Sequence, residues 1–154
     1  MLVRPRLGRR PQVPLGAMLC SDAANVFAPG DHATTYGGNP LACAAGLAVA
    51  AAIDDDGLVA NAAARGAQLK AGLAAMAAKH PSKVADVRGL GLLLGLELAP
   101  ELGGAAKFVQ AASDKGLLLV PAGADVVRFV PPLVVSSAEI DDALGILGAC
   151  LDEA

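Results

Sequence analysis

Between Leu58 and Met76 the apolar residues recur with the 3.6-residue period of an α-helix, and this pattern stops at Pro81. The stripe consists of Leu58, Ala62, Leu69, Leu73 and Met76. The sequence then changes to two runs typical of β-strands, over residues 83–88 and 90–98, broken by glycines as at a tight connection or bulge. This segment therefore predicts an amphipathic helix that ends near Pro81 and is followed by two strands.

The rest of the chain continues to mix the two kinds of element. We expect a helix over 105–113, strands over 117–120 and 126–130 around a turn at 121–123, and a final helix with the stripe Ile140, Leu144, Leu147 and Leu151. Ser136 with Glu139 three residues later forms the pattern of a capping box, which marks where the last helix begins. The fold class is therefore α/β to α+β.

Earlier in the chain, Asn39-Pro40 predicts the start of a helix over 41–53, because Asn caps free N–H groups and Pro suits the first helical position. Residues 1–13 are rich in Arg and Pro and show no period, so they form a segment of their own. We expect residues 14–80 and 81–154 to be two further parts, the second of them a small α+β domain.

Charge and hydropathy exclude several classes of protein. Four arginines and no acid lie in the first 12 residues, and the remainder carries 8 basic against 15 acidic residues. A nucleic-acid-binding domain has a basic body instead. The longest apolar run, over 41–53, is shorter than the roughly 18 residues of a spanning helix, so we expect no membrane segment. With 55% hydrophobic residues, 34 of them alanine, the chain is not disordered and has a core of small side chains.

The cysteines point to neither disulfides nor a metal. Cys20, Cys43 and Cys150 are odd in number and lack a C-x-x-C spacing, as expected of reduced thiols in a cytoplasmic protein. His32 with Cys20 and Cys43 matches no zinc pattern.

The stretch over 32–40 places Thr34, Thr35 and two glycines directly before the predicted helix at 41. Glycines allow a ligand to approach the backbone, and a helix N-terminus favours an anion, so a phosphate or carboxylate could bind here. The alternative is a capped turn whose threonines satisfy the backbone.

Arg128 is the charged residue of an apolar strand pattern and shares a face with Val126 and Val130. It lies at a sheet edge, where it reaches water, or it binds a carboxylate; the residues themselves favour the edge. Gly89-Leu90-Gly91 imitates a dinucleotide fingerprint, but a strand and not a helix follows it, so we expect no nucleotide.

Three stretches in the same order resemble the ornithine-type (class III) pyridoxal-phosphate-dependent aminotransferases. They cover residues 30–44, 87–95 and 121–133, and the whole resemblance covers about 14–152. It corresponds to the C-terminal part of the family's sequence, that is, the end of the large domain and the small domain of a fold type I transferase. The resemblance is greatest to the members that transfer an amino group from N-acetylornithine to 2-oxoglutarate in arginine biosynthesis.

The resemblance implies a role for three residues. The threonine that matches Thr35 binds the phosphate of pyridoxal 5′-phosphate across a dimer interface, the residue that matches Thr34 lies near the substrate, and the arginine that matches Arg128 binds the substrate's α-carboxylate. It therefore implies a homodimer, or a pair with a full-length aminotransferase subunit.

One departure from the family matters as much. The lysine that binds the cofactor and then moves the proton falls at Leu7, and the first lysine in the chain is Lys70. We therefore expect this chain alone to be inactive. It could instead be a non-catalytic partner of a complete subunit, or have no function. Ornithine, succinylornithine, 4-aminobutyrate and succinyl-diaminopimelate enzymes share the motifs, so the amino donor stays open.

Overall fold

The computed structural model describes residue 13 and residues 15–154. The first segment predicted above, residues 1–13, therefore lies almost wholly outside the described residues. The chain divides into two compact units, residues 1–56 and 57–154, and each is described below by itself. Among the described helices, none combines the length and the apolar character that a membrane crossing requires.

The first unit contains a short 3₁₀ turn, η1 (Asp22–Ala24), and one long helix, α1 (Pro40–Asp55). The start of α1 confirms the sequence prediction: Asn39 is the N-cap, its side chain accepts a hydrogen bond from the Ala42 N–H, and Pro40 is the first helical residue. Ala42 is the one buried residue among those described in this unit. This unit therefore has almost no core of its own.

The second unit is built on a four-stranded antiparallel sheet in the order β1-β2-β4-β3. Its elements in chain order are α2 (Leu58–Lys79), β1 (Val84–Leu90), β2 (Leu93–Leu98), η2 (Pro100–Leu102), α3 (Ala105–Asp114), β3 (Val120–Ala122), β4 (Val126–Phe129) and α4 (Ser137–Glu153). Because the crossover from β2 leads through α3 to the far edge, β4 returns between β2 and β3.

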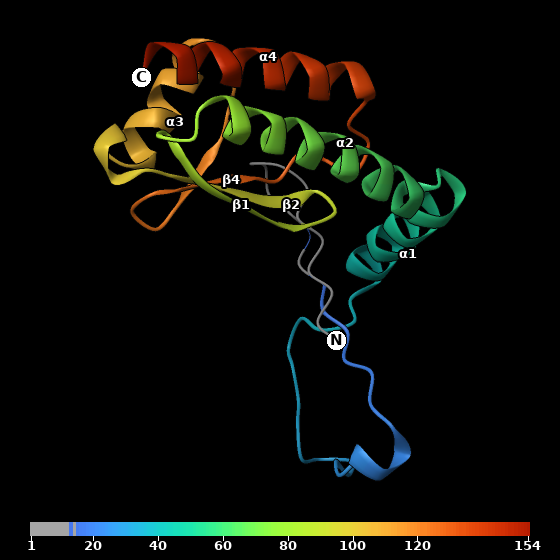
Figure 1. The fold of residues 1–154 in the computed structure, drawn as a ribbon. Coiled ribbons are helices and arrows are strands. Elements are labelled where there is room, and N and C mark those ends of the chain that lie inside the picture. The colour runs from blue at the N-terminus through green and yellow to red at the C-terminus, as the bar shows by residue number, and fades with distance from the viewer. Residues whose placement is uncertain (1–12, 14) are drawn as a thin grey trace. The chain divides into compact units, whose positions relative to one another are not determined.

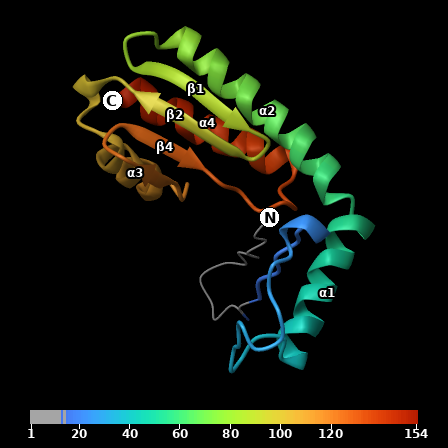
Figure 2. The same cartoon turned by 90° about the horizontal axis from the view of Figure 1, so that it is seen from below.

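The three helices of this unit cover one face of the sheet (Figure 1). The alternate residues that point toward them form the core, which includes Leu94, Leu96, Leu98, Val127 and Phe129. The helices contribute Leu69, Leu73, Phe108, Ile140, Leu147 and Leu151 to the same cluster. Figure 2 views the strands from the opposite side, where no helix of this unit lies. Side chains on that open face are available for other contacts.

The sequence predicted the helices of this unit better than its strands. The compact unit begins at Gly57 and not at residue 81, since α2 packs against β1, β2 and α4. The break expected at Gly89 was wrong, because β1 continues to Leu90 and Gly89 accommodates a φ of +126° inside the strand. The tight connection expected at Gly91 is confirmed, because a turn at residues 91–92 joins β1 to β2. The strand expected over 117–120 occurs instead at β3 (Val120–Ala122). Pro121 fits there because β3 is an edge strand, which need not donate on its outer side.

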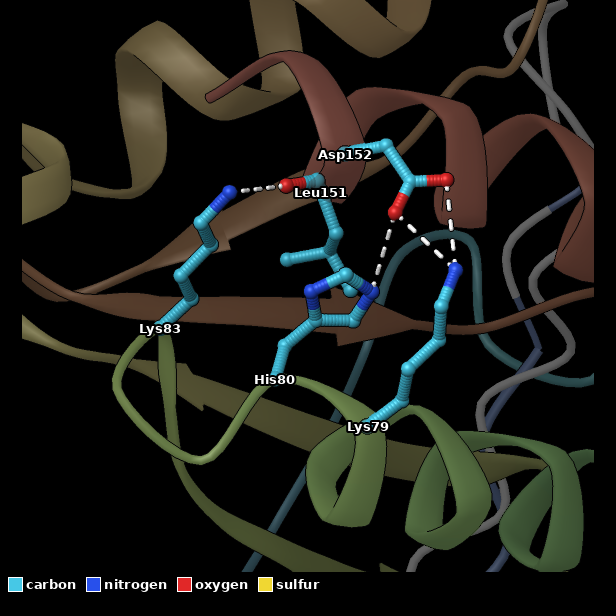
Figure 3. Close-up of polar contacts among 5 residues, drawn as sticks. All are labelled: Lys79, His80, Lys83, Leu151 and Asp152. Carbon is cyan, nitrogen blue, oxygen red and sulfur yellow. Dashed lines mark hydrogen bonds and ion pairs between the residues drawn. The ribbon is translucent and has the colours of Figure 1, made fainter.

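Both ends of α4 are fastened by side chains. At its start the predicted capping box is confirmed: Ser136 accepts from the Glu139 N–H, and the Glu139 carboxylate accepts from the Ser136 N–H at 2.8 Å. Near its end Lys83 donates to the Leu151 carbonyl at 2.6 Å, and Lys79 donates to Asp152 at 3.0 Å, as Figure 3 shows. Because cations favour the C-terminal end of a helix dipole, these lysines tie α4 to α2 and to the turn that precedes β1.

Candidate functional site

In the first unit, the loop before α1 is held by side chains on both sides of Thr35. The Thr34 hydroxyl accepts a hydrogen bond from the Gly37 N–H at 3.1 Å, and the Asn39 amide donates to the Tyr36 carbonyl at 3.0 Å. A Cβ atom at Gly37 would overlap the Thr34 methyl group, so this turn needs the glycine. Thr34 therefore follows the capped-turn alternative, in which a threonine satisfies the backbone.

Thr35 differs from its neighbour. It is exposed, and its hydroxyl makes no hydrogen bond within the described part of the chain. The carboxylate nearest in the sequence, Asp31, already accepts from the Ala28 N–H at 2.6 Å. The loop thus exposes the hydroxyl of Thr35, which can donate a hydrogen bond to an oxygen atom of a ligand.

The start of α1 offers fewer donors than the sequence suggested. Pro40 has no N–H group, that of Ala42 donates to the Asn39 side chain at 2.9 Å, and that of Cys43 donates to the Asn39 carbonyl at 3.0 Å. In the described part of this turn, only the Leu41 N–H is left without an acceptor. An anion here would rest on Thr35 and one N–H group, aided by the helix dipole.

In the second unit, Arg128 lies on β4, which is an interior strand. The edge position favoured from the sequence was therefore wrong. The predicted face is correct, because Arg128 alternates with the buried Val127 and Phe129 and so points to the open face of the sheet. Its Nε atom is buried and has no hydrogen-bond partner in the described structure. A guanidinium that is held on a strand and has no carboxylate partner there is suited to bind the carboxylate of a ligand.

The surroundings of Arg128 form a shallow hollow of about 260 Å³ on this open face. Apolar Leu90, Leu93 and Ala122 line it together with Gly95 and a second arginine, Arg88. Gly95 is the register partner of Arg128 on β2, so no side chain stands directly beside the guanidinium on that strand. The hollow combines an apolar lining with a cationic group, as small-molecule sites do.

Arg88 was not identified from the sequence as a site residue. It pairs with two carboxylates, Asp86 at 2.8 Å and Glu97. The hydrogen bond from Arg88 holds the pKa of Asp86 below its ordinary value, and the carboxylate of Glu97 raises the pKa of Arg88. Only the register between β1 and β2 brings Arg88 to Glu97, and no local sequence signal reports that register. No cluster of potential metal ligands exists among the described residues.

A sequence model described as Aminotransferase class-III matches residues 13–151. The chain belongs to the class-III aminotransferases.

Curated relatives and solved structures agree with this membership. The acetylornithine aminotransferase of Thermosynechococcus vestitus is 54% identical over 140 residues, which are 90% of this chain and 34% of that protein. The acetylornithine aminotransferase of Caldanaerobacter subterraneus is 44% identical over 91% of this chain and 35% of that protein. The chain thus spans about a third of the length of these relatives.

Two solved structures show the same fold. An ornithine aminotransferase from Toxoplasma gondii aligns with a TM-score of 0.79 and 31% identity, over 86% of this chain and 32% of that one. An acetylornithine aminotransferase from Elizabethkingia anophelis aligns with a TM-score of 0.77 and 28% identity, over 83% of this chain and 32% of that one. The α+β fold is therefore that of the corresponding third of a pyridoxal-phosphate-dependent aminotransferase.

Class-III aminotransferases use pyridoxal 5′-phosphate. The exposed hydroxyl of Thr35 and the Leu41 N–H are both donors, which is the chemistry that phosphate oxygens require. These residues fit the phosphate of the cofactor. Leu7, which the resemblance places at the position of the family's lysine, lies outside the described residues.

Proposed function

We propose that this chain contributes substrate- and cofactor-binding residues to a pyridoxal-phosphate-dependent aminotransferase that acts on N-acetylornithine and 2-oxoglutarate, in the cytoplasm. The observation that carries the proposal is the guanidinium of Arg128, which has no carboxylate partner in the described structure and faces an open hollow. The high identity to acetylornithine aminotransferases supports the choice of amino donor.

Each residue has a simple physical task in this proposal. When bound, the cofactor supplies the aldehyde and the electron-withdrawing ring on which amino-group transfer depends. Arg128 binds and orients the substrate carboxylate through paired N–H donors. Thr35 donates to a phosphate oxygen in the site of a neighbouring subunit, while Thr34 shapes the turn beside the substrate. An α-carboxylate bound at Arg128 favours an α-amino acid donor over 4-aminobutyrate.

The chain alone is proposed to be inactive. The family's lysine has Leu7 as its match, and the leucine side chain can neither bond to the cofactor aldehyde nor move a proton. When N-acetylornithine, 2-oxoglutarate and pyridoxal 5′-phosphate are added to the purified chain, we expect no amino transfer above background. Turnover by the chain alone would contradict this proposal.

The exposed apolar surface of the first unit favours binding to a protein partner. Its large apolar side chains are exposed, among them Leu19, Val26, Phe27, Tyr36 and Leu47, while Ala42 is its one buried residue among those described. Apolar surface of this extent is typical of a protein–protein contact. We propose that a second aminotransferase subunit, either another copy or a complete one, covers it.

The carboxylate site can be tested on the chain itself by titrating it with 2-oxoglutarate while following arginine side chains by NMR. Arg128→Gln should weaken binding about 10- to 100-fold, since hydrogen bonds to a charged group contribute about 1.5–3 kcal/mol and 1.4 kcal/mol is a factor of ten. Arg65→Gln is the matched control, because Arg65 lies on α2 and donates to Gln68. Binding to Arg128→Gln with unchanged affinity would overturn the assignment.

A further inference from the structure

Two rows of side chains cross the open face of the sheet, and both arginines lie in one of them. Arg88 of β1 pairs in register with Gly95 of β2, and Gly95 pairs with Arg128 of β4. Asp86 and Glu97 pair in the next row. Since residues two apart on a strand share a face, these side chains all project to the same side.

Glu97 occupies a position between the two arginines. It lies two residues from Gly95 on β2, and is therefore a diagonal neighbour of Arg88 on one side and of Arg128 on the other. Diagonal neighbours have Cβ atoms about 7–8 Å apart, within reach of long side chains. Because Gly95 carries no side chain, nothing at that register position separates Glu97 from either guanidinium.

The structure shows that Glu97 pairs with Arg88. Its Oε2 atom contacts Nη1 of Arg88, and the same Nη1 atom also contacts Asp86 at 2.8 Å. The aliphatic part of the Arg88 side chain lies beside Gly95, and its Cγ atom is 3.9 Å from the position that a Cβ atom of residue 95 would occupy. Arg88 is thus held between two carboxylates, and Arg128 is left with none in the described structure.

We propose that Arg88 is a positioning residue that holds Glu97 away from Arg128 and so keeps the guanidinium of Arg128 available to a carboxylate ligand. Glu97 is an internal competitor for that guanidinium, because it would occupy the site that a substrate carboxylate needs. Without Arg88, Arg128 is the arginine that remains in a register position diagonal to Glu97 on this face. The ligand part of this inference rests on the proposed function, but the exchange of partners does not.

The exchange can be measured on the full chain without any ligand. Phenylglyoxal reacts with accessible guanidinium groups, and the modified peptides can be quantified by mass spectrometry. In Arg88→Gln, Glu97 should pair with Arg128 and slow its modification at least threefold. In the double variant Arg88→Gln/Glu97→Gln, Asp86 still lies on this face, but it is on β1, which β2 separates from β4. The modification rate of Arg128 should therefore return to within about 1.5-fold of the wild-type rate.

Two further variants separate positioning from a general loss of structure. Arg88→Lys keeps a cation between Asp86 and Glu97 and should retain the wild-type rate at Arg128. Arg88→Met keeps much of the apolar stem and should behave as Arg88→Gln does, which provides a second measurement if the glutamine variant folds poorly. Since the Arg88 side chain is 51% exposed, we expect all of these variants to fold.

An unchanged rate at Arg128 in both Arg88→Gln and Arg88→Met would overturn the inference. So would a slow rate that persists in the double variant, since the effect would then not come from Glu97. Repeating the experiment with 2-oxoglutarate tests the proposed function separately. Protection of Arg128 in the wild type and the double variant supports the carboxylate ligand, and its absence contradicts that ligand while leaving the exchange of partners established.

Discussion

Gly95 of β2 lies directly opposite Arg128 of β4 in the antiparallel register, and the arginine therefore has a neighbour without a side chain. A Cβ atom at position 95 would lie 3.2 Å from Cγ1 of Val126, which already borders the hollow. The glycine thus creates the space in which the guanidinium can meet a ligand.

Gly95→Val should weaken the binding of 2-oxoglutarate at least tenfold, because the new methyl groups fill the space beside Arg128. Overpacking of this kind also costs about 1–3 kcal/mol of stability. An NMR titration measures the affinity, and urea unfolding measures the stability. If Gly95→Val binds 2-oxoglutarate as the wild type does, the hollow is not the ligand site.

Two helical glycines should respond in opposite ways to alanine. A Cβ at Gly66 of α2 would overlap the backbone carbonyl of Gly91, whereas one at Gly145 of α4 would meet nothing within 4 Å. Gly66→Ala should therefore lower the free energy of unfolding by about 1–3 kcal/mol. Gly145→Ala should raise it by about 0.5–1 kcal/mol, since alanine loses less backbone entropy in a helix. Urea unfolding measures both, and equal effects would contradict the close packing of α2 on the β1–β2 turn.

The interactions of Asp152 with Lys79 and His80, at the C-terminal end of α4, should make the free energy of unfolding depend on pH. The hydrogen bond from Lys79 holds the pKa of Asp152 below its ordinary value of 3.8, and the charges of His80 and Lys83 act in the same direction. A lowered pKa in the folded state stabilises the fold above pH 3.8, and that contribution is lost as the pH falls from 3.8 through the lower folded value. Asp152→Asn should therefore lose less stability than the wild type between about pH 5 and about pH 2.5. Urea unfolding at each pH measures the free energy of unfolding of both proteins. If it falls equally in both as the pH is lowered, the interaction of Asp152 in Figure 3 does not stabilise the fold.

The starts of α1 and α4 were predictable from the sequence because their signals are local. Asn39 with Pro40 and Ser136 with Glu139 each satisfy N–H groups within four residues, so the chain near them contains the necessary information. The strand near Pro121 was misplaced because a proline normally argues against a strand, and only the order of the sheet shows that it lies at an edge.

The candidate site was only partly predictable for the same reason. Thr34, Thr35 and Arg128 were identified through a resemblance, and the face of Arg128 followed from strand alternation. The neighbours of Arg128 depend on the register of three strands, which joins residues 88, 95 and 128. The pairing of Arg88 with Glu97, and the resulting lack of a carboxylate at Arg128, could be found only in the structure.

The most direct test of the proposed function uses the threonine of the first unit. A full-length acetylornithine aminotransferase whose own match to Thr35 is replaced by valine should lose most of its activity. It is mixed with this chain, and amino transfer from N-acetylornithine to 2-oxoglutarate is measured. A mixed dimer should restore turnover, because Thr35 then reaches the phosphate in the complete subunit's site, whereas the chain carrying Thr35→Val should pair equally well and restore none. Equal turnover with the two chains, or no association with the complete subunit, would contradict the account.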